Sequence, residues 1–254
     1  MGLLFIAPNR HPTIMKYLYL LSLVFMVCGC AEDNPPSTVP CFEKEYYEMQ
    51  LFYGLQRIAF NGSSDRFSIQ NLNPDIIEIS SIEDGYLKFT PLRKGTATLL
   101  VKDKLGDAST TIRIKMVDKY LCFYVRDHYT VQQPFYGTGS YMFLVNDEKR
   151  TAYLYDDSFN LKEKGTYAFE LNNGRYYFSA SYTKDSFVYD ITSSDRNVLL
   201  GIPYYLDFQW SEDEPRQSTR EAAPDFMTAI DIETNITYNF VLRSSIEMPY
   251  HVLD

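Results

Sequence analysis

The chain has 254 residues, with 24 Lys and Arg against 33 Asp and Glu, and a formal net charge of −9 at pH 7. Its hydrophobic content of 45% is enough to form packed cores, so a globally disordered chain is excluded. The acidic balance argues against nucleic-acid binding, which needs clustered Lys and Arg. With three His and four Cys, the composition also argues against a metal centre built on those residues, and we expect no cofactor.

An apolar run of 11 residues, YLYLLSLVFMV, occupies positions 17–27 directly after Lys16. A helix that crosses a bilayer needs about 20 such residues. A short apolar run behind a positive charge is typical of a secretory signal peptide, so we predict a signal over residues 1–29. Met15 is then the expected natural start, and residues 1–14 are expected to be an over-extended gene start.

The apolar run ends in Val27-Cys28-Gly29-Cys30. A small residue directly before a Cys resembles the signal of bacterial lipoproteins, in which that Cys is lipidated and becomes the mature N-terminus. The resemblance implies that Cys30 carries a lipid anchor in the outer membrane, because Gly29 fits the preceding position and Val27 does not. An ordinary signal peptide with an incidental Cys is the alternative.

Residues 30–40 are polar and contain two adjacent prolines, which predicts an extended tether. The acidic pair Glu32-Asp33 behind Cys30 resembles the export signal of surface lipoproteins in the Bacteroidetes. This resemblance implies exposure at the cell surface. A lipoprotein that faces the periplasm is the alternative.

Charge and aromatic content change together near Asp118-Lys119. Residues 41–118 carry −1 and 9 aromatic side chains in 78 positions, whereas residues 119–254 carry −8 and 27 aromatic side chains in 136 positions. A joint shift of this kind indicates a domain boundary. We therefore expect one domain over 41–118 and a second, acidic and aromatic domain over 119–254.

The first domain contains short segments in which apolar and polar side chains alternate, the pattern of half-buried strands. These segments are 67–69, 77–79, 86–89, 96–101 and 111–116. Turn residues at 73–75, 84–85, 94–95 and 105–107 separate them. So many short strands in 78 residues predict a β-sandwich.

Two stretches of this domain, NPDIIEI at 73–79 and GYLKFTPLRKGTATL at 85–99, resemble bacterial Ig-like domains. The resemblance implies a β-sandwich. It implies no particular activity, because such domains serve as spacers, adhesin stalks and carbohydrate-protein modules alike. Gly95 is expected to adopt a positive φ in the turn between two strands.

The second domain also has the pattern of antiparallel strands, and no segment shows a helical period. The expected strands are 120–125, 140–145, 151–155, 165–171, 175–182, 187–191 and 236–242. Asn173-Gly174 predicts a tight hairpin turn. The segment GTYAFELNNG at 165–174 resembles the lipocalin-like barrels attached to Bacteroidetes lipoproteins. A second sandwich is the first choice and a small lipocalin-like barrel the alternative, so the fold class is all-β.

No common catalytic or nucleotide-binding motif occurs in the chain. His128 and His251 are expected to be ordinary surface residues. Residues 156–160, DDSFN, lack the spacing of a calcium loop and are expected to form a turn. The 20 acidic residues of the second domain single out no carboxylate pair, so we expect a protein without catalytic residues.

The most unusual segment runs from Asp207 to Glu233, with eight acidic and two basic residues. The only Trp of the chain, Trp210, lies here, close to Tyr204, Tyr205 and Phe208. Exposed aromatic rings stack on sugar faces and dominate many interfaces. These four residues are therefore the candidate ligand-binding residues, and a solvated loop without a ligand is the alternative.

Cys41 and Cys122 begin the two domains and are left after lipidation of Cys30. An exported compartment permits a disulfide between them, provided that their Cα atoms come within about 7 Å. Together these patterns favour a lipid-anchored cell-envelope protein with a non-catalytic binding or adhesion function toward a glycan or an envelope protein. A glycan-processing accessory enzyme and a structural subunit of an envelope assembly are the alternatives.

Overall fold

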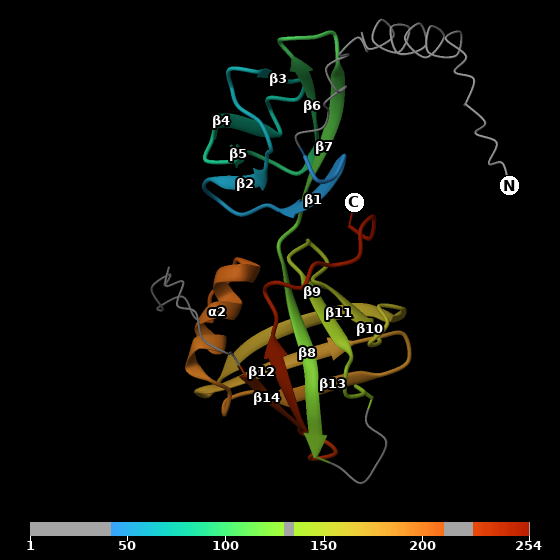
Figure 1. Cartoon of the computed structure of the whole chain (residues 1–254). Coiled ribbons are helices and arrows are strands. Elements are labelled where there is room, and N and C mark those ends of the chain that lie inside the picture. The colour runs from blue at the N-terminus through green and yellow to red at the C-terminus, as the bar shows by residue number, and fades with distance from the viewer. Residues whose placement is uncertain (1–41, 130–134, 211–225, 254) are drawn as a thin grey trace, which may run out of the picture.

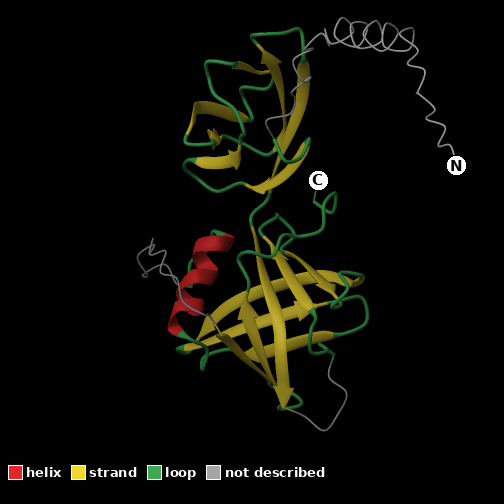
Figure 2. Ribbon diagram, viewed as in Figure 1, coloured by secondary structure: helices red, strands yellow, loops and turns green. Residues whose placement is uncertain are grey.

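The computed structural model describes residues 42–129, 135–210 and 226–253. The predicted signal, the tether, Cys30 and Cys41 lie outside these residues. The described chain is mostly β, with two small sheets followed by a closed barrel and a short helix (Figures 1 and 2). Within these ranges no helix is both long and apolar enough to span a bilayer.

The first two sheets pack face to face as a sandwich. One sheet has the order β1 (Tyr46–Gln50), β7 (Ser109–Val117), β6 (Gly95–Asp103), β3 (Phe67–Asn71), and the other β2 (Gln56–Ala59), β5 (Tyr86–Pro91), β4 (Ile77–Glu83). Strand β1 is parallel to β7, and the other pairs are antiparallel. Leu87, Phe89 and Leu99 are fully buried between the sheets. The predicted sandwich is thus confirmed.

Gly95 has the positive φ that the sequence predicts, at +136°. A Cβ atom on this residue would also approach Ile76 Cδ1 to 2.6 Å, so glycine is required both for its backbone conformation and for space.

The second part of the chain forms an eight-stranded antiparallel barrel. Its strands are β8 (Tyr120–Tyr129), β9 (Tyr141–Val145), β10 (Thr151–Tyr155), β11 (Leu161–Asn172), β12 (Arg175–Ser181), β13 (Ser186–Asp190), β14 (Phe226–Asp231) and β15 (Thr237–Leu242). Each strand pairs with the next, and β15 pairs with β8 to close the sheet. The barrel alternative is therefore right and the first choice of a second sandwich is wrong, because each of the eight strands pairs on both of its edges and none is left as the edge of an open sheet. Asn173 and Gly174 have the positive φ values of the predicted hairpin turn.

Two elements of this region were not predicted. Helix α2 (Arg196–Leu206) contains Gly201 and Pro203, which weaken its helical pattern. Its buried residues nevertheless recur at helical spacing and join the hydrophobic core of the barrel. Strand β14 lies inside the segment expected to be one long acidic loop, so that expectation is wrong for residues 226–231.

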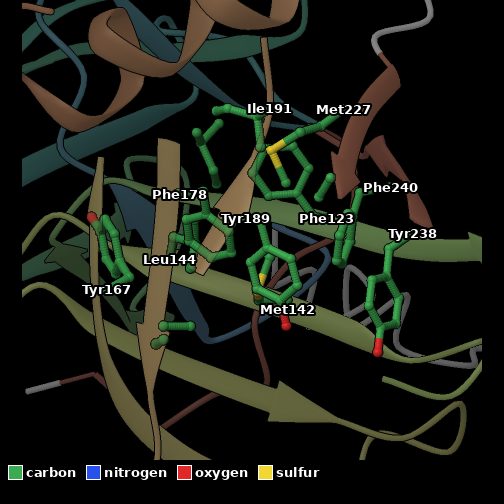
Figure 3. Close-up of a cluster of buried hydrophobic side chains, with 14 of the residues drawn as sticks. Phe123, Met142, Leu144, Tyr167, Phe178, Tyr189, Ile191, Met227, Tyr238 and Phe240 are labelled. Carbon is green, nitrogen blue, oxygen red and sulfur yellow. The ribbon is translucent and has the colours of Figure 1, made fainter. Parts of the chain in front are cut away.

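The interior of the barrel is a packed aromatic core (Figure 3). Tyr136, which precedes β9, is fully buried in this core. Its ring centroid lies 5.4 Å from that of Tyr238 and 5.6 Å from that of Phe240, and its hydroxyl donates a hydrogen bond of 3.2 Å to the Tyr182 hydroxyl. Side chains of the protein itself therefore occupy the centre of the barrel.

Residues 243–253, here called the C-terminal strap, run from the barrel back to the sandwich (Figure 1). The backbone N–H of Met248 donates to the Tyr120 hydroxyl at 3.0 Å, and that of His251 donates to Glu48 Oε1 at 2.8 Å. The strap also covers outward-facing side chains of β8, β9 and β10. This cover explains why all five residues of β10 are buried, although a barrel strand normally exposes alternate side chains.

Replacing Tyr136 by Ala should remove the central ring of the barrel core and lower the free energy of unfolding by about 3–5 kcal/mol, since large aromatic truncations leave a cavity. Tyr129→Ala is the matched control, because Tyr129 is 69% exposed. Urea unfolding followed by circular dichroism measures both variants. Added phenol should recover part of the loss in Tyr136→Ala alone. Equal destabilisation of the two variants would contradict the packing described here.

Candidate functional site

The sandwich and the barrel meet where β7 ends at Val117 and β8 begins at Tyr120. Lys119 in this short connection is buried, with 7% of its surface exposed. Its Nζ lies 2.5 Å from Oδ1 of Asp207, the residue that ends α2. The other carboxylate oxygen of Asp207 accepts a hydrogen bond of 3.0 Å from Asn146 Nδ2. An ion pair thus fastens the end of α2 to the junction.

The connection between β1 and β2 lies beside this ion pair and is fixed by side chains and backbone. Gln56 Nε2 donates to the carbonyl oxygen of Gln50 at 2.9 Å and to that of Phe52 at 3.4 Å. The backbone N–H of Leu51 donates to the Val117 carbonyl at 2.9 Å. Gln50 Oε1 accepts a hydrogen bond of 2.9 Å from the N–H of Tyr120, the first barrel residue. The loop is therefore tied to the sandwich, and Gln50 directly before it is tied to the barrel.

Aromatic rings from this loop and from α2 come together over the junction. The ring centroids of Phe52 and Tyr205 are 5.7 Å apart, and those of Tyr204 and Tyr205 are 5.4 Å apart. Lys119 Nζ lies 5.5 Å from the centre of the Tyr53 ring. Tyr53 is 90% exposed and Tyr204 is 43% exposed. We call Phe52, Tyr53, Tyr204 and Tyr205 the junction patch.

Only two of the four predicted ligand-binding residues belong to this patch, namely Tyr204 and Tyr205. The expectation of an exposed Trp210 is wrong, because this residue is 8% exposed and its Nε1 donates a 2.6 Å hydrogen bond to the Leu199 carbonyl. Its ring packs against Tyr176 at 4.8 Å between centroids, which fastens α2 to the barrel. Phe208 stacks on a barrel residue, Phe169, at 5.8 Å.

Phe52 and Tyr53 were not predicted as site residues, because nothing in the local sequence pattern links them to α2. Their signal was an aromatic pair directly before Gly54, which adopts a positive φ of 101° in the turn. The acidic residues at positions 212–225, and with them most of the predicted acidic loop, lie outside the described residues.

The buried carboxylates of the barrel have structural roles. Burial would raise the pKa of Asp190, but hydrogen bonds from Thr192 and the Arg175 guanidinium outweigh it and lower the pKa. Asp231 Oδ1 accepts backbone N–H groups of Glu233 at 2.9 Å and of Thr234 at 3.1 Å, which stabilises the turn after β14. Among the described residues, no group of three or more His, Cys, Asp or Glu side chains could hold a metal ion.

The two histidines of the barrel region differ in environment. His251 is exposed and stacks on Tyr46, with ring centroids 5.0 Å apart. His128 is half-buried, and its Nδ1 is a buried atom with no hydrogen-bond partner among the residues that the structure describes. The expectation of two surface histidines therefore holds for His251 and only in part for His128, whose ring lies beside that of Tyr238 on the paired strand, with 6.4 Å between the centroids.

Cys122 is buried in the outer wall of the barrel and has no disulfide partner among the described residues, and burial raises the pKa of its thiol to about 12. Its predicted disulfide partner, Cys41, lies outside the described residues, so this bond stays a prediction. The turn expected at 156–160 is confirmed, because Asp156 Oδ1 accepts the backbone N–H groups of Ser158 at 3.0 Å and Asn160 at 2.8 Å.

No protein-family model matches the chain. No curated protein matches it either. Among solved structures, domains 5–6 of the S-layer protein SbsC align over 79% of this chain and 92% of that one, with 12% identity and a TM-score of 0.23. Domains 4–9 of the surface layer protein SbsC align over 78% of this chain and 29% of that one, with 10% identity and the same TM-score. At this TM-score the similarity supports no conclusion about fold or function.

Replacing Lys119 by Met should keep the buried stem but remove the charge that Asp207 pairs with. We expect the free energy of unfolding to fall by about 1–2 kcal/mol, more than for an exposed pair and less than for a fully buried one. Lys94→Met is the matched control, because Lys94 pairs with Asp118 at 2.8 Å but its side chain is 50% exposed. Chemical unfolding compares the two variants. An equal decrease in the free energy of unfolding in both would show that the junction ion pair stabilises the protein no more than an exposed pair does.

Proposed function

We propose that this protein is a lipid-anchored cell-envelope binding or adhesion module, which binds a glycan or a protein on the junction patch without catalysing a reaction. The observation that carries the proposal is the exposure of the Tyr53 side chain. Tyr53 lies on a loop that hydrogen bonds hold to the sandwich and, through Gln50 directly before the loop, to the barrel.

Leaving a large aromatic ring 90% exposed to water gains nothing for folding. Such a ring contributes strongly once a ligand covers it, because tyrosine brings a large contact area with few rotatable bonds. The loop around Tyr53 is already ordered by Gln56 and Leu51, so binding need not supply the free energy to order it. This preorganisation favours a recognition role over an accidental exposure.

The surroundings of Tyr53 suit a partly polar ligand. Tyrosine rings stack on apolar faces of sugars or of protein side chains, and their hydroxyl groups form hydrogen bonds at the edge. The Asp207 side chain is 48% exposed beside the patch and keeps acceptor capacity for a hydroxyl or amide group, since a carboxylate accepts several hydrogen bonds. Tyrosine rings beside a carboxylate can bind either a glycan or a protein.

The order of the chain supports an anchored arrangement. The predicted lipid site at Cys30 and its tether precede the sandwich, and the sandwich precedes the barrel. The strap and the junction ion pair connect sandwich and barrel at separate points, so the geometry of the junction patch does not depend on the tether. The sandwich then acts as a spacer between the membrane and the patch.

The double variant Tyr53→Ala/Tyr204→Ala tests the proposal. Binding of the purified protein to a glycan array and to immobilised mucin should weaken by about tenfold or more, as expected when central aromatic anchors are truncated. Mucin whose glycans have been removed separates the two ligand classes, because binding that persists identifies a protein ligand. The circular dichroism spectrum should stay unchanged, since both side chains are at the surface.

Leu105→Ala is the matched control, because Leu105 is 82% exposed in the turn between β6 and β7 of the sandwich. It should bind as the unmodified protein does. If the double variant and the control bind equally well, or if the unmodified protein binds to none of the surfaces, the junction patch is not the recognition site.

A further inference from the structure

The outer wall of the barrel carries a second group of aromatic side chains, which the C-terminal strap leaves partly uncovered. Tyr124 on β8 is paired across the sheet with Tyr141 on β9, and Tyr141 in turn is paired with Tyr155 on β10. The ring centroids of Tyr124 and Tyr141 lie 5.3 Å apart. Both residues are half-buried, whereas Tyr155 is only 3% exposed. The row therefore reaches the surface at Tyr124 and Tyr141.

Phe159, in the turn after β10, covers the end of this row. Its ring stacks on Tyr141 with centroids 4.5 Å apart and planes inclined by 16°, and it remains 38% exposed. Its φ of +60° is uncommon for a bulky residue. Backbone strain of this kind persists only where the surroundings enforce it, and it clusters at functional sites.

Asp156 enforces that conformation. Its carboxylate accepts the backbone N–H groups of Ser158 and Asn160 and pairs with Lys162 Nζ at 2.8 Å. The Lys162 ammonium, followed by the Asn160 backbone N–H, holds the pKa of Asp156 well below its usual range. The carboxylate thus stays ionised at physiological pH and keeps Phe159 stacked on Tyr141.

Arg243, the first residue of the strap, borders the other end of the row. Its guanidinium carbon lies 5.8 Å from the centre of the Tyr124 ring. Its backbone N–H donates to the Cys122 carbonyl at 2.8 Å, so its position along β8 is fixed. Arg243 is exposed, and no carboxylate of the described chain pairs with it. In a chain with nine more acidic than basic residues, an arginine without an acidic partner is available to an external anion.

We propose that Arg243, Tyr124, Tyr141 and Phe159 form a binding site for a carboxylate-bearing sugar, such as a uronic acid residue of an acidic glycan. The guanidinium binds the sugar carboxylate through two parallel hydrogen bonds, the geometry that arginine favours. The aromatic rings stack on the apolar face of the sugar ring, and the Tyr124 and Tyr141 hydroxyl groups form hydrogen bonds with the hydroxyl groups of the sugar. The site shares no residue with the junction patch and does not rest on the function proposed for that patch.

The chemistry separates this ligand from its alternatives. A neutral sugar would use the rings but leave the guanidinium unpaired. A simple anion would pair with the guanidinium but leave the rings uncovered. A ligand with both an apolar ring face and a carboxylate uses the whole row, and a sugar that bears a carboxylate has both.

Isothermal titration calorimetry of the full chain with a short oligogalacturonate tests the site. The matched probe is the same oligomer with its carboxylates reduced to alcohols, which should bind at least about tenfold more weakly, because charge-assisted hydrogen bonds are lost. Arg243→Gln should lower affinity for the acidic oligomer by a similar factor. Tyr124→Ala should weaken both oligomers, since stacking does not depend on the carboxylate.

Arg126→Gln is the control variant for Arg243→Gln, because Arg126 lies on β8 as Tyr124 does, is exposed and has its own partner in Asp127 at 3.6 Å. It should bind the acidic oligomer as the unmodified protein does. The Tyr53→Ala/Tyr204→Ala variant should also bind it normally, so the two sites can fail independently. Equal binding of both oligomers, normal binding by Arg243→Gln, or no binding by the unmodified protein would overturn the proposal.

Discussion

The two-residue connection between β7 and β8 is the constraint on which the arrangement of this molecule depends. On one side of it the Val117 carbonyl accepts the Leu51 N–H, and on the other the Tyr120 N–H donates to the side chain of Gln50 at the end of β1. A connection so short cannot reorient without breaking these bonds. The burial of Lys119 and the place of the Tyr53 loop beside it follow from this constraint. The strap adds a second attachment, and two separate attachments resist rotation better than one.

Much of the fold could be predicted because the physical signal was local. Period-2 alternation located most strands, and Asn173-Gly174 located a hairpin, since both depend on neighbouring residues alone. Barrel closure could not be predicted, because pairing of β15 with β8 joins residues more than a hundred positions apart. Helix α2 was missed for a different reason. Gly201 and Pro203 lower its intrinsic propensity, and packing of its apolar face against the barrel compensates for that loss.

The candidate site was predicted only in part, and the reason is again distance along the chain. Tyr204 and Tyr205 lie in a recognisably aromatic segment, but the residues they meet come from the other part of the molecule. Trp210 shows the opposite error. It lies in an acidic segment, which suggested exposure. Its indole N–H nevertheless donates to the Leu199 carbonyl, and its ring packs against Tyr176 of the barrel. Burial of a large aromatic ring with its polar atom satisfied is the more favourable outcome.

Side chains fill the interior of the barrel, which leaves its outer surface for ligand binding. Barrels of this strand number either close on their own side chains or hold one small ligand. Here Tyr136 occupies the centre and bonds to Tyr182, so the interior volume serves stability. The surplus of tyrosine in the second half of the chain is then divided between two tasks. Inward-facing rings build the core, and outward-facing rings either pack under the strap or remain at the surface. One of these surface rings, Tyr124, lies beside Arg243, as Tyr53 of the sandwich lies beside Lys119, and an adjacent cation distinguishes a recognition surface from a merely apolar one.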